Sequence, residues 1–544
     1  MRGLIKKRYF WIALYGMVQA VLYTALLPLW EGFDEPFHYG YVETILHGGG
    51  LPAMGRTKVR GEIWETVKLV PASAVVRRNI PGVMTFDEYF RLGHAERTEL
   101  RARLNAVPAD APAGPPNYEA HQAPLAYLAL APVDWAIQDW PIPRRVFVLR
   151  IVAAWSACLL MTFAVASLAG HLELAGLYRD VLLFLIFSTQ MFYATAAHIA
   201  NDWLAVSLAA WWFAALAGFS ARPEIKRSWA VTLLVSLGLL AKAYFVAFVP
   251  VAVVALVWAA WRQRRPGIAA ALAGLLAAAP WYVRNERLYG HLIATQEALA
   301  GVGMQRTFET ARHVPWLRAA RVMSHYALWT GNNSFTSFSR LTIDAMLVAL
   351  GLAAVLYAIR WPPSRERAVL AACLLFLAAL AYTTASNYAF QHAIAANGWY
   401  AQPILAPCLA LLLCGIASAG HAGRWLCGAM MALWTWVAAA TYFVKLIPLY
   451  GGFAKGRAVP AALVRWYWGD HARLVDLLST TALAPAWVIL VLAGMVTGAA
   501  AWLGAWILTD CCSAACGGKR KGTIRTDSMR NHSDSASFRG AREG

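Results

Sequence analysis

Charged side chains are scarce in this sequence. Asp, Glu, Lys and Arg make up 14% of its 544 residues, whereas hydrophobic residues make up 59%. The mean hydropathy is +0.48, and several apolar runs are long enough to cross a bilayer. These features exclude an ordinary soluble domain, in which roughly 25% of the residues are charged. The sequence therefore indicates a polytopic membrane protein.

The eight cysteines lack any regular spacing. They lie in apolar runs or near the C-terminus, so they predict neither a disulfide framework nor a zinc site. Cys511, Cys512 and Cys516 have no His or further Cys at ligand spacing, which favours a solvated tail over a metal site. A signal-peptide cleavage site is also lacking after the first apolar run, so we expect that run to be a retained anchor.

Acidic residues are outnumbered, with 29 against 48 basic residues and a net charge of +19. The Lys and Arg residues come in short clusters between apolar runs, as the positive-inside rule expects, rather than along one basic groove. The charge therefore predicts a lipid bilayer as the partner and no nucleic acid. With these clusters on the cytoplasmic side, both termini are expected in the cytoplasm.

The apolar runs predict an all-α fold with about twelve transmembrane helices. The expected spans are residues 10–29, 146–168, 181–197, 203–219, two within 229–261, and then 267–283, 342–359, 368–386, 403–419, 425–446 and 485–508. Basic clusters flank residues 229–261 on both sides, so we expect two short helices there, hinged near Ala241-Lys242-Ala243. The apolar run after Pro124 is short for a span and predicts a re-entrant or interfacial helix.

A large polar loop follows the first span. Residues 31–145 form this predicted first extracytoplasmic loop, which is rich in Pro, Gly and charges of both signs. Near its start, Phe37, Tyr41 and Ile45 share one stripe, which is typical of a helix lying flat on a membrane. Residues 1–509 are then one transmembrane unit, and residues 510–544 a disordered, basic cytoplasmic tail.

The segment Glu31-Gly32-Phe33-Asp34-Glu35-Pro36-Phe37-His38 comes directly after the first span. Ionisable residues at a membrane margin are functional candidates by default. Asp34 has a structural alternative, because an Asp just before Pro36 can cap a helix by accepting backbone N–H bonds. Capping does not account for Glu35 and His38. Adjacent side chains point in different directions, so one carboxylate can hold the site while the other acts as a base.

Five segments resemble, in order, motifs of the GT-C glycosyltransferases, which include protein O-mannosyltransferases and lipid A aminoarabinose transferases. They are Asp34-Glu35-Pro36-x-His38, Glu119-x-His121-Gln122-x-Pro124-Leu125-x-Tyr127, Asn201-Asp202, Gly238-Leu239-Leu240-Ala241-Lys242 and Trp281-Tyr282-Val283-Arg284-Asn285. The first looks most like that of uncharacterised bacterial members. The chain departs from the family pattern at Ala120, Ala241 and Trp399, where relatives often have Lys, Thr and Arg. Phosphate contacts made by those cations are then missing or supplied by other residues.

The resemblance implies a GT-C-type bundle and an enzyme of a bacterial inner membrane. Such an enzyme moves a sugar from a polyprenyl-phosphate donor to a lipid, glycan or protein acceptor on the extracytoplasmic face. The acceptor hydroxyl loses a proton as it attacks the anomeric carbon, and a carboxylate can take that proton. We expect Asp34 to be this base, with Glu35 as the second catalytic residue. Burial beside Phe33 and Phe37 is expected to raise the pKa of Asp34.

The leaving phosphate gains negative charge and needs a fixed cation. We favour Arg284 and then Lys242, because Arg contacts phosphate in a bidentate way. Arg144, Arg145 and Arg150 are further candidates that snorkelling to the interface explains equally well. The other predicted substrate-binding residues are His38, Glu119, His121, Asn201, Asp202 and Tyr400.

These additional candidates have structural alternatives. Asn201 and Asp202 can equally cap a helix, and Tyr400 can anchor the chain at the membrane interface. The chemistry requires no cofactor. A divalent metal could bind His38 with Asp34, but their spacing does not identify a metal site.

Two alternatives stay open at this stage. A multipass transporter or flippase for lipid-linked sugars explains the basic inner loops equally well. It is disfavoured because the sequence shows no internal repeat, and because its polar residues gather in outer loops rather than at midplane helix breaks. A ligase or polymerase of surface polysaccharide, which also uses lipid-linked sugars, is the other alternative. The sequence does not specify the sugar, the acceptor or the polyprenol.

Overall fold

The helical architecture follows from the apolar composition. A computed structural model describes residues 2–73, 76, 80, 82–394, 397–453 and 460–516. Within these ranges the chain forms helices and no strand, and isolated β-bridges connect a few loops. Long apolar sequences favour helices because a helix satisfies its own backbone N–H and C=O groups. The all-α prediction is confirmed.

Ten stretches of helix in the described ranges are long and apolar enough to cross a membrane. They are α1 (Arg2–Leu26), α8 (Ile142–His171), α11 (Asp202–Ala221), η2 with α13 (Ala243–Phe248, Val249–Gln263), α14 with η3 and α15 (Pro266–Ala270, Ala271–Ala278, Ala279–Tyr289), α19 (Arg340–Ala358), α20 (Ser364–Gln391), η5 with α21 (Gly398–Ile404, Leu405–Ser418), α22 with η6 and α23 (Gly420–Ala440, Thr441–Leu446, Ile447–Tyr450) and α26 (Ala486–Cys516). The chain is a polytopic membrane protein.

The two other expected spans are also helical, but one is shorter and one is broken. The first is α12 (Ile225–Ala241), which has 17 residues. Two helices, α9 (Gly176–Phe187) and α10 (Gln190–Ala196), replace the expected span at 181–197. At the break, the Thr189 hydroxyl donates to the Leu185 carbonyl oxygen at 2.8 Å. The Thr189 hydroxyl thus provides a hydrogen bond to a backbone carbonyl group at the interrupted end of α9.

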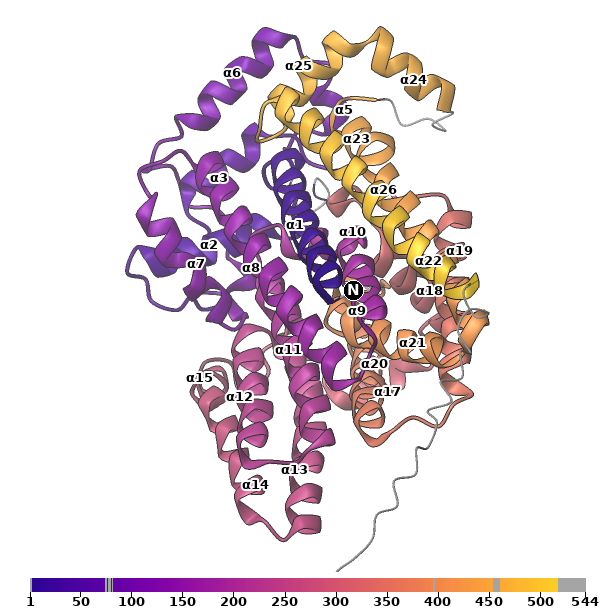
Figure 1. Ribbon diagram of the computed structural model, residues 1–544. Helices are drawn as coiled ribbons and strands as arrows, with labels where there is room; N and C mark the ends of the chain where they lie inside the picture. Colours follow the sequence, from indigo (N-terminus) through magenta and orange to yellow (C-terminus); the bar gives the residue numbers. More distant parts are fainter. Residues whose placement is uncertain are drawn as a thin grey trace, which may run out of the picture.

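The helix α1 runs through the middle of the molecule, where it contacts α8, α9 and α26 (Figure 1). At its first turns, the buried side chain of Arg8 pairs with Asp180 of α9, with 2.8 Å between Nε and Oδ2. The helices α12, α13 and α14 group at one end of the molecule. The helices of the first loop lie along one side, next to α8.

The described residues of the first loop include six helical segments: α2 (Glu35–Leu46), α3 (Gly61–Leu69), α5 (Phe86–Tyr89), α6 (His94–Asn105), η1 (Tyr118–His121) and α7 (Leu125–Ala136). The helix α7 has 12 residues, so it is short, as expected. The prediction that α2 lies flat on a membrane is wrong, because every residue from Glu35 to Glu43 is buried in protein. Its aromatic stripe packs on the rest of the loop: Phe37 lies 4.2 Å from the Tyr118 ring, and Tyr41 lies 4.0 Å from the Tyr127 ring.

The later loops also contain helices. They are α16 (Gln296–Leu299), α17 (Met304–Ala311), α18 (Trp316–Leu328), η4 (Asn332–Ser334), α24 (Pro460–Gly469) and α25 (His471–Thr481). The helices α6 and α25 lie together at the top of Figure 1. There Arg97 pairs with Asp476, and the Tyr89 hydroxyl donates to the Thr480 carbonyl oxygen at 2.9 Å. These contacts fix the first loop against the last one.

The C-terminal helix is longer than the sequence predicts. It continues past residue 509, where we placed the end of the transmembrane unit, as far as Cys516. In this extension the Cys511 sulfur lies 3.9 Å from the Cys427 sulfur of α22, and both side chains are buried. The predicted tail from residue 517 onward lies outside the described residues.

Candidate active site

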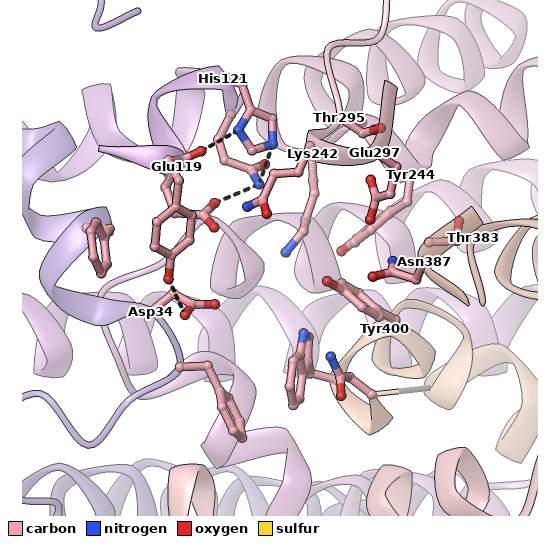
Figure 2. Close-up of a pocket in the computed structure, with 18 of the residues that line it drawn as sticks. Asp34, Glu119, His121, Lys242, Tyr244, Thr295, Glu297, Thr383, Asn387 and Tyr400 are labelled. Carbon is pink, nitrogen blue, oxygen red and sulfur yellow. Dashed lines mark hydrogen bonds between the residues drawn. The ribbon is translucent and has the colours of Figure 1, made fainter. Parts of the chain in front are cut away.

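A cavity of about 1110 Å³ lies among the first loop, the hinge after α12, the helix α20 and η5. Figure 2 shows its polar side chains in two groups, with Lys242 between them. One group contains Asp34, Glu119 and His121. The other contains Tyr244, Glu297, Thr383, Asn387 and Tyr400. Apolar and aromatic residues form the rest of the wall.

Asp34 lies at the start of α2 in an unusual backbone conformation, with φ 55° and ψ 17°. This left-handed region costs most residues about 1–2 kcal/mol, although Asp tolerates it better than most. The turn also needs Gly32, because a Cβ there would lie 2.7 Å from the Cβ of His198. Pro36 then begins the helix. Backbone turn and helix start together direct the Asp34 side chain away from α2.

The Asp34 carboxylate does not cap its helix, which removes the structural alternative for this residue. Its Oδ1 accepts a hydrogen bond from the Tyr118 hydroxyl at 2.5 Å, and the side chain lines the cavity. Loss of bulk water around it raises the pKa of Asp34, as expected. The Tyr118 hydrogen bond and the positive charge of Lys242 partly oppose this rise in pKa.

Glu35 occupies a different environment, although it is adjacent in sequence. It is fully buried and pairs with Arg150 of α8, whose Nε lies 2.7 Å from Oε1. The backbone N–H of Ile199 donates to the same oxygen at 3.0 Å. Glu35 is not among the residues that line the cavity. The predicted catalytic role of Glu35 therefore has no geometric support, because Arg150 and the backbone already use its carboxylate.

Two of the three arginines at the start of α8 are buried in ion pairs. Arg150 also donates to the carbonyl oxygens of Leu27 and Pro28, at 2.7 and 3.0 Å. Arg145 pairs with Asp134, with 2.9 Å between Nε and Oδ1, and with Glu43. Neither side chain snorkels, and neither is available to a phosphate. Arg144, in contrast, is exposed.

Arg284, the cation favoured from the sequence, does not line the cavity. Its Nη2 donates to the carbonyl oxygens of Leu51 and Pro52, at 3.0 and 2.8 Å. Its guanidinium group lies 4.8 Å from the centre of the Trp281 ring. These contacts hold α15 against the first loop, and the geometry favours Lys242 over Arg284 as the cation of the cavity.

Lys242 is the single Lys or Arg among the described residues that line the cavity. It is extended, with φ −156° and ψ 137°, between α12 and η2, which confirms the predicted hinge. The turn is tight, because a Cβ at Gly238 would lie 2.0 Å from a ring carbon of Phe245. The Lys242 Nζ lies 2.6 Å from Asp202 Oδ2 and 5.8 Å from the centre of the Tyr400 ring.

Asn201 and Asp202 contact residues of the cavity wall but do not line the cavity themselves. Asn201 makes no side-chain cap for α11; its Nδ2 donates to Gln122 Oε1 at 3.0 Å and to the Ala241 carbonyl oxygen at 3.1 Å. Asp202 uses one oxygen for Lys242. Neither residue lines the cavity. The two residues instead join the first loop to the hinge that carries Lys242.

The segment η1 places Glu119 and His121 on the cavity wall. Asn117 begins η1 by accepting a hydrogen bond from the Glu119 backbone N–H at 3.0 Å. The Gln122 amide donates to Glu119 Oε2 at 2.8 Å. Burial, with the charge of Asp34 beside it, raises the pKa of Glu119 to about 8. Burial lowers the pKa of His121 to about 4, so this imidazole is neutral at pH 7.

His38 and Tyr400 differ in their access to the cavity. His38 lies behind the wall, with Nδ1 2.7 Å from the Tyr127 hydroxyl, and burial lowers its pKa. It is not a lining residue, so its predicted contact with substrate has no support from the geometry. Tyr400 does line the cavity, next to Trp399, whose ring stacks 4.1 Å from Phe33.

Several lining residues were not nominated from the sequence. Gln122 belongs to the second motif and Tyr118 directly precedes it, but nothing in their spacing shows that they contact Asn201 and Asp34. Thr383 and Asn387 lie one helical turn apart on α20 and both line the cavity. Polar residues four apart near the end of a span were the available signal for this pair.

The metal pairing of His38 with Asp34 that we considered does not form a cluster of ligands. Among the described residues, the group of three potential ligands is Glu43, His47 and Glu62. Arg60 lies against it, with Nε 2.9 Å from Glu62 Oε1 and 3.6 Å from Glu43 Oε2. Arg145 also contacts Glu43. These guanidinium groups balance the carboxylates, so the cluster has the character of an ion-pair network.

No protein-family model and no curated protein matches this chain. Among solved structures, the chain is similar to the crystal structure of ArnT from Cupriavidus metallidurans bound to undecaprenyl phosphate. The TM-score is 0.45 and the sequence identity 12%, over 94% of this chain and 76% of that one. At these values the similarity supports no conclusion about function. Such a conclusion has to rest on the residues of the cavity.

Proposed function

We propose that this chain is an integral membrane glycosyltransferase. It moves a sugar from a polyprenyl-phosphate donor to a lipid, glycan or protein acceptor by a base-assisted, inverting displacement. One observation carries the proposal: a carboxylate with a raised pKa, Asp34, and a buried ammonium group, Lys242, line the same cavity, and the remaining wall is largely apolar.

Asp34 is the base in this proposal. The acceptor hydroxyl attacks the anomeric carbon and gives its proton to the free carboxylate oxygen. General base catalysis of this kind contributes roughly 10²–10⁴-fold in rate. The raised pKa improves the carboxylate as a base, while the hydrogen bond from Tyr118 holds its orientation.

Lys242 is the cation that receives the leaving phosphate. The bond between the anomeric carbon and the phosphate oxygen breaks, and its electron pair leaves with the phosphate. A fixed positive charge in a cavity shielded from bulk water stabilises this developing charge. Asp202 and the rings of Tyr244 and Tyr400 hold the ammonium group in place, so it needs no reorganisation during the reaction.

The apolar wall fits the polyprenyl chain of such a donor. Residues from α3 and the segment after it form one part, and residues from η2 and α20 form another; these are Val67, Val70, Ala72, Val246, Phe376 and Leu380. Each buried CH₂ of a lipid chain contributes about 0.8 kcal/mol to binding. A long isoprenoid tail can therefore provide most of the affinity, while the phosphate provides the position.

The orientation in this proposal follows from the basic clusters between spans. The positive-inside rule places those clusters and both termini in the cytoplasm of a bacterial cell, and the first loop with the cavity outside the inner membrane. A surface-polysaccharide ligase or polymerase would use the same donor class. The identity of the acceptor separates these enzymes.

Purified protein in proteoliposomes, mixed with a radiolabelled polyprenyl-phosphate sugar, tests the proposal. We expect release of the sugar to an added acceptor or, slowly, to water, with the free polyprenyl phosphate as the second product. The variant Asp139→Asn, which changes an exposed carboxylate remote from the cavity lining, serves as a positive control. A transporter or flippase would move the donor across the membrane and leave it intact, which would contradict the proposal.

A further inference from the structure

Glu119 differs from three buried acidic residues near the cavity. Glu35, Glu43 and Asp202 each pair with an Arg or Lys. Glu119 is only 5% exposed, yet no Lys or Arg of the described chain forms an ion pair with it; its recorded partner is the amide of Gln122. A buried carboxylate without a cation is costly, and the usual outcome is that the group keeps its proton.

The neighbours of Glu119 make a second negative charge on this wall still less favourable. Asp34 lies on the same side of the cavity and is linked to η1 through the Tyr118 hydroxyl (Figure 2). The charge of Lys242 is already matched by Asp202. If Asp34 and Glu119 were both ionised, the wall would repel any donor that carries a phosphate.

Of the two carboxyl groups, Asp34 is the one suited to ionisation. It accepts a short hydrogen bond from a hydroxyl, which favours the charged form, and it is open to the cavity. Glu119 accepts a hydrogen bond from a neutral amide and, although it lines the cavity, is only 5% exposed. Two carboxyl groups that share a site in this way divide the roles of charged base and neutral acid.

We propose that Glu119 works as a neutral carboxylic acid whose O–H donates a hydrogen bond to a phosphate oxygen of the donor, while Asp34 is the ionised base. This inference rests on the proposed function. In the transfer step, the acceptor oxygen bonds to the anomeric carbon and its proton moves to Asp34. The bond from that carbon to the phosphate oxygen breaks, and the phosphate keeps the electron pair. Glu119 keeps its proton throughout, and its hydrogen bond strengthens as the phosphate gains charge.

The electrostatic surroundings agree with this role. The pKa of Glu119 is about 8, raised first by burial and then by the charge of Asp34. A phosphate monoester has a second pKa of about 6, so the proton stays on Glu119. The other charged or titratable groups that act on Glu119, or on which it acts, are Lys242, Asp202, Tyr118, Tyr127 and Tyr400.

Binding of a labelled polyprenyl monophosphate to the full chain in nanodiscs tests this role without turnover. Between pH 7.5 and 9.5 the phosphate of this probe has a constant charge, because its second pKa is about 6. We expect its Kd to rise about tenfold per pH unit above the pKa of Glu119. In Glu119→Gln, which keeps a neutral donor, we expect tight binding with no such rise. Glu99→Gln, the same change at an exposed residue of α6 that does not line the cavity, should keep the pH dependence of the unchanged protein.

Two results would overturn the role of Glu119. One is a Kd of the unchanged protein that stays constant from pH 7.5 to 9.5. The other is a large loss of binding in Glu119→Gln at pH 7.5, because it would show that the carboxylate is needed. Thermal unfolding of the variant separates that loss from misfolding. Failure of the proposed function gives a different result, since the unchanged protein would then release no sugar from the radiolabelled donor, whatever the pH dependence of its binding to the probe.

Discussion

The buried carboxyl group of Glu35 differs from the carboxyl groups of Asp34 and Glu119 on the cavity wall in how completely it is paired. Below the loop, Glu35 and Arg150 use their charges on each other, and Arg150 also binds two backbone carbonyl groups. On the wall, Asp34 has one hydroxyl partner and Glu119 one amide partner. Complete pairing produces a fixed support. Incomplete pairing leaves groups able to exchange protons or contact a ligand.

This contrast explains how two adjacent carboxylates have unlike roles. The left-handed backbone of Asp34 directs its side chain to the cavity, whereas Glu35, in the first turn of α2, points into the bundle. The turn at the start of α2 thus attaches the first loop to α8 through Glu35 and directs the Asp34 carboxylate into the cavity. Each of the following changes tests one side of the contrast.

The largest effect is expected for the buried pair. Arg150→Ala leaves Glu35 buried and unpaired, which costs about 3–5 kcal/mol. We expect a strong drop in the thermal unfolding temperature and in the yield of folded protein. The exposed neighbour provides a control, since Arg144→Ala should change neither. The double change Glu35→Leu with Arg150→Met should recover most of the stability, because no unpaired charge remains; if it did not, the pair would matter for more than charge balance.

On the cavity side, Lys242→Met should weaken donor use strongly, and it should also lower stability because it leaves the buried Asp202 carboxylate without its cation. Removing a preorganised group that stabilises developing charge typically costs about 10²–10³-fold in rate. The steady-state rate of sugar release, measured beside thermal unfolding, checks this. Lys226→Met, which changes an exposed lysine, is the matched control. Equal rates for the two variants would remove Lys242 from the mechanism.

A smaller change is expected in the pH profile. Because Asp34 has to be ionised to act as a base, activity should fall as the pH drops through its raised pKa. Tyr118→Phe removes a hydrogen bond that stabilises the charged form, so the pKa of Asp34 should rise and the acidic limb should move to higher pH. Rates of sugar release from pH 5 to 8 measure this. If the acidic limb of the pH–rate profile stayed in place or moved to lower pH, Tyr118 would not be the group that lowers the pKa of Asp34.

The smallest effect concerns Arg284. Its hydrogen bonds to the carbonyl groups of Leu51 and Pro52 are worth about 1–3 kcal/mol in stability. Arg284→Ala should therefore lower the unfolding temperature slightly and leave the Kd for a polyprenyl phosphate nearly unchanged. A large loss of donor binding in a folded Arg284→Ala protein would instead support Arg284 as the cation that binds the phosphate, as the sequence alone suggested.

Local features of the fold could be predicted from the sequence. The hinge at Lys242 followed from basic clusters on either side of one long apolar run, and the short helix α7 followed from the length of its run. The break between α9 and α10 could not be predicted in this way. It depends on Thr189 and Trp434, which are 245 positions apart in the chain.

The site was only partly predictable for the same reason. Asp34, Glu119, His121 and Lys242, which lie in the ordered motifs, and Tyr400, which does not, all line the cavity. The sequence could not show that Glu35 pairs with a residue 115 positions away, or that Arg284 binds backbone carbonyl groups. Whether a charge is free depends on its partner in three dimensions. A linear motif does not specify that partner.

The rate of sugar release by Asp34→Asn, measured together with donor binding, tests the central claim most directly. The claim is that Asp34 is the free carboxylate that accepts the proton of the acceptor. It predicts that Asp34→Asn binds the polyprenyl-phosphate donor and loses roughly 10²–10⁴-fold in rate. A folded Asp34→Asn protein that transfers the sugar at a near-normal rate would contradict the claim.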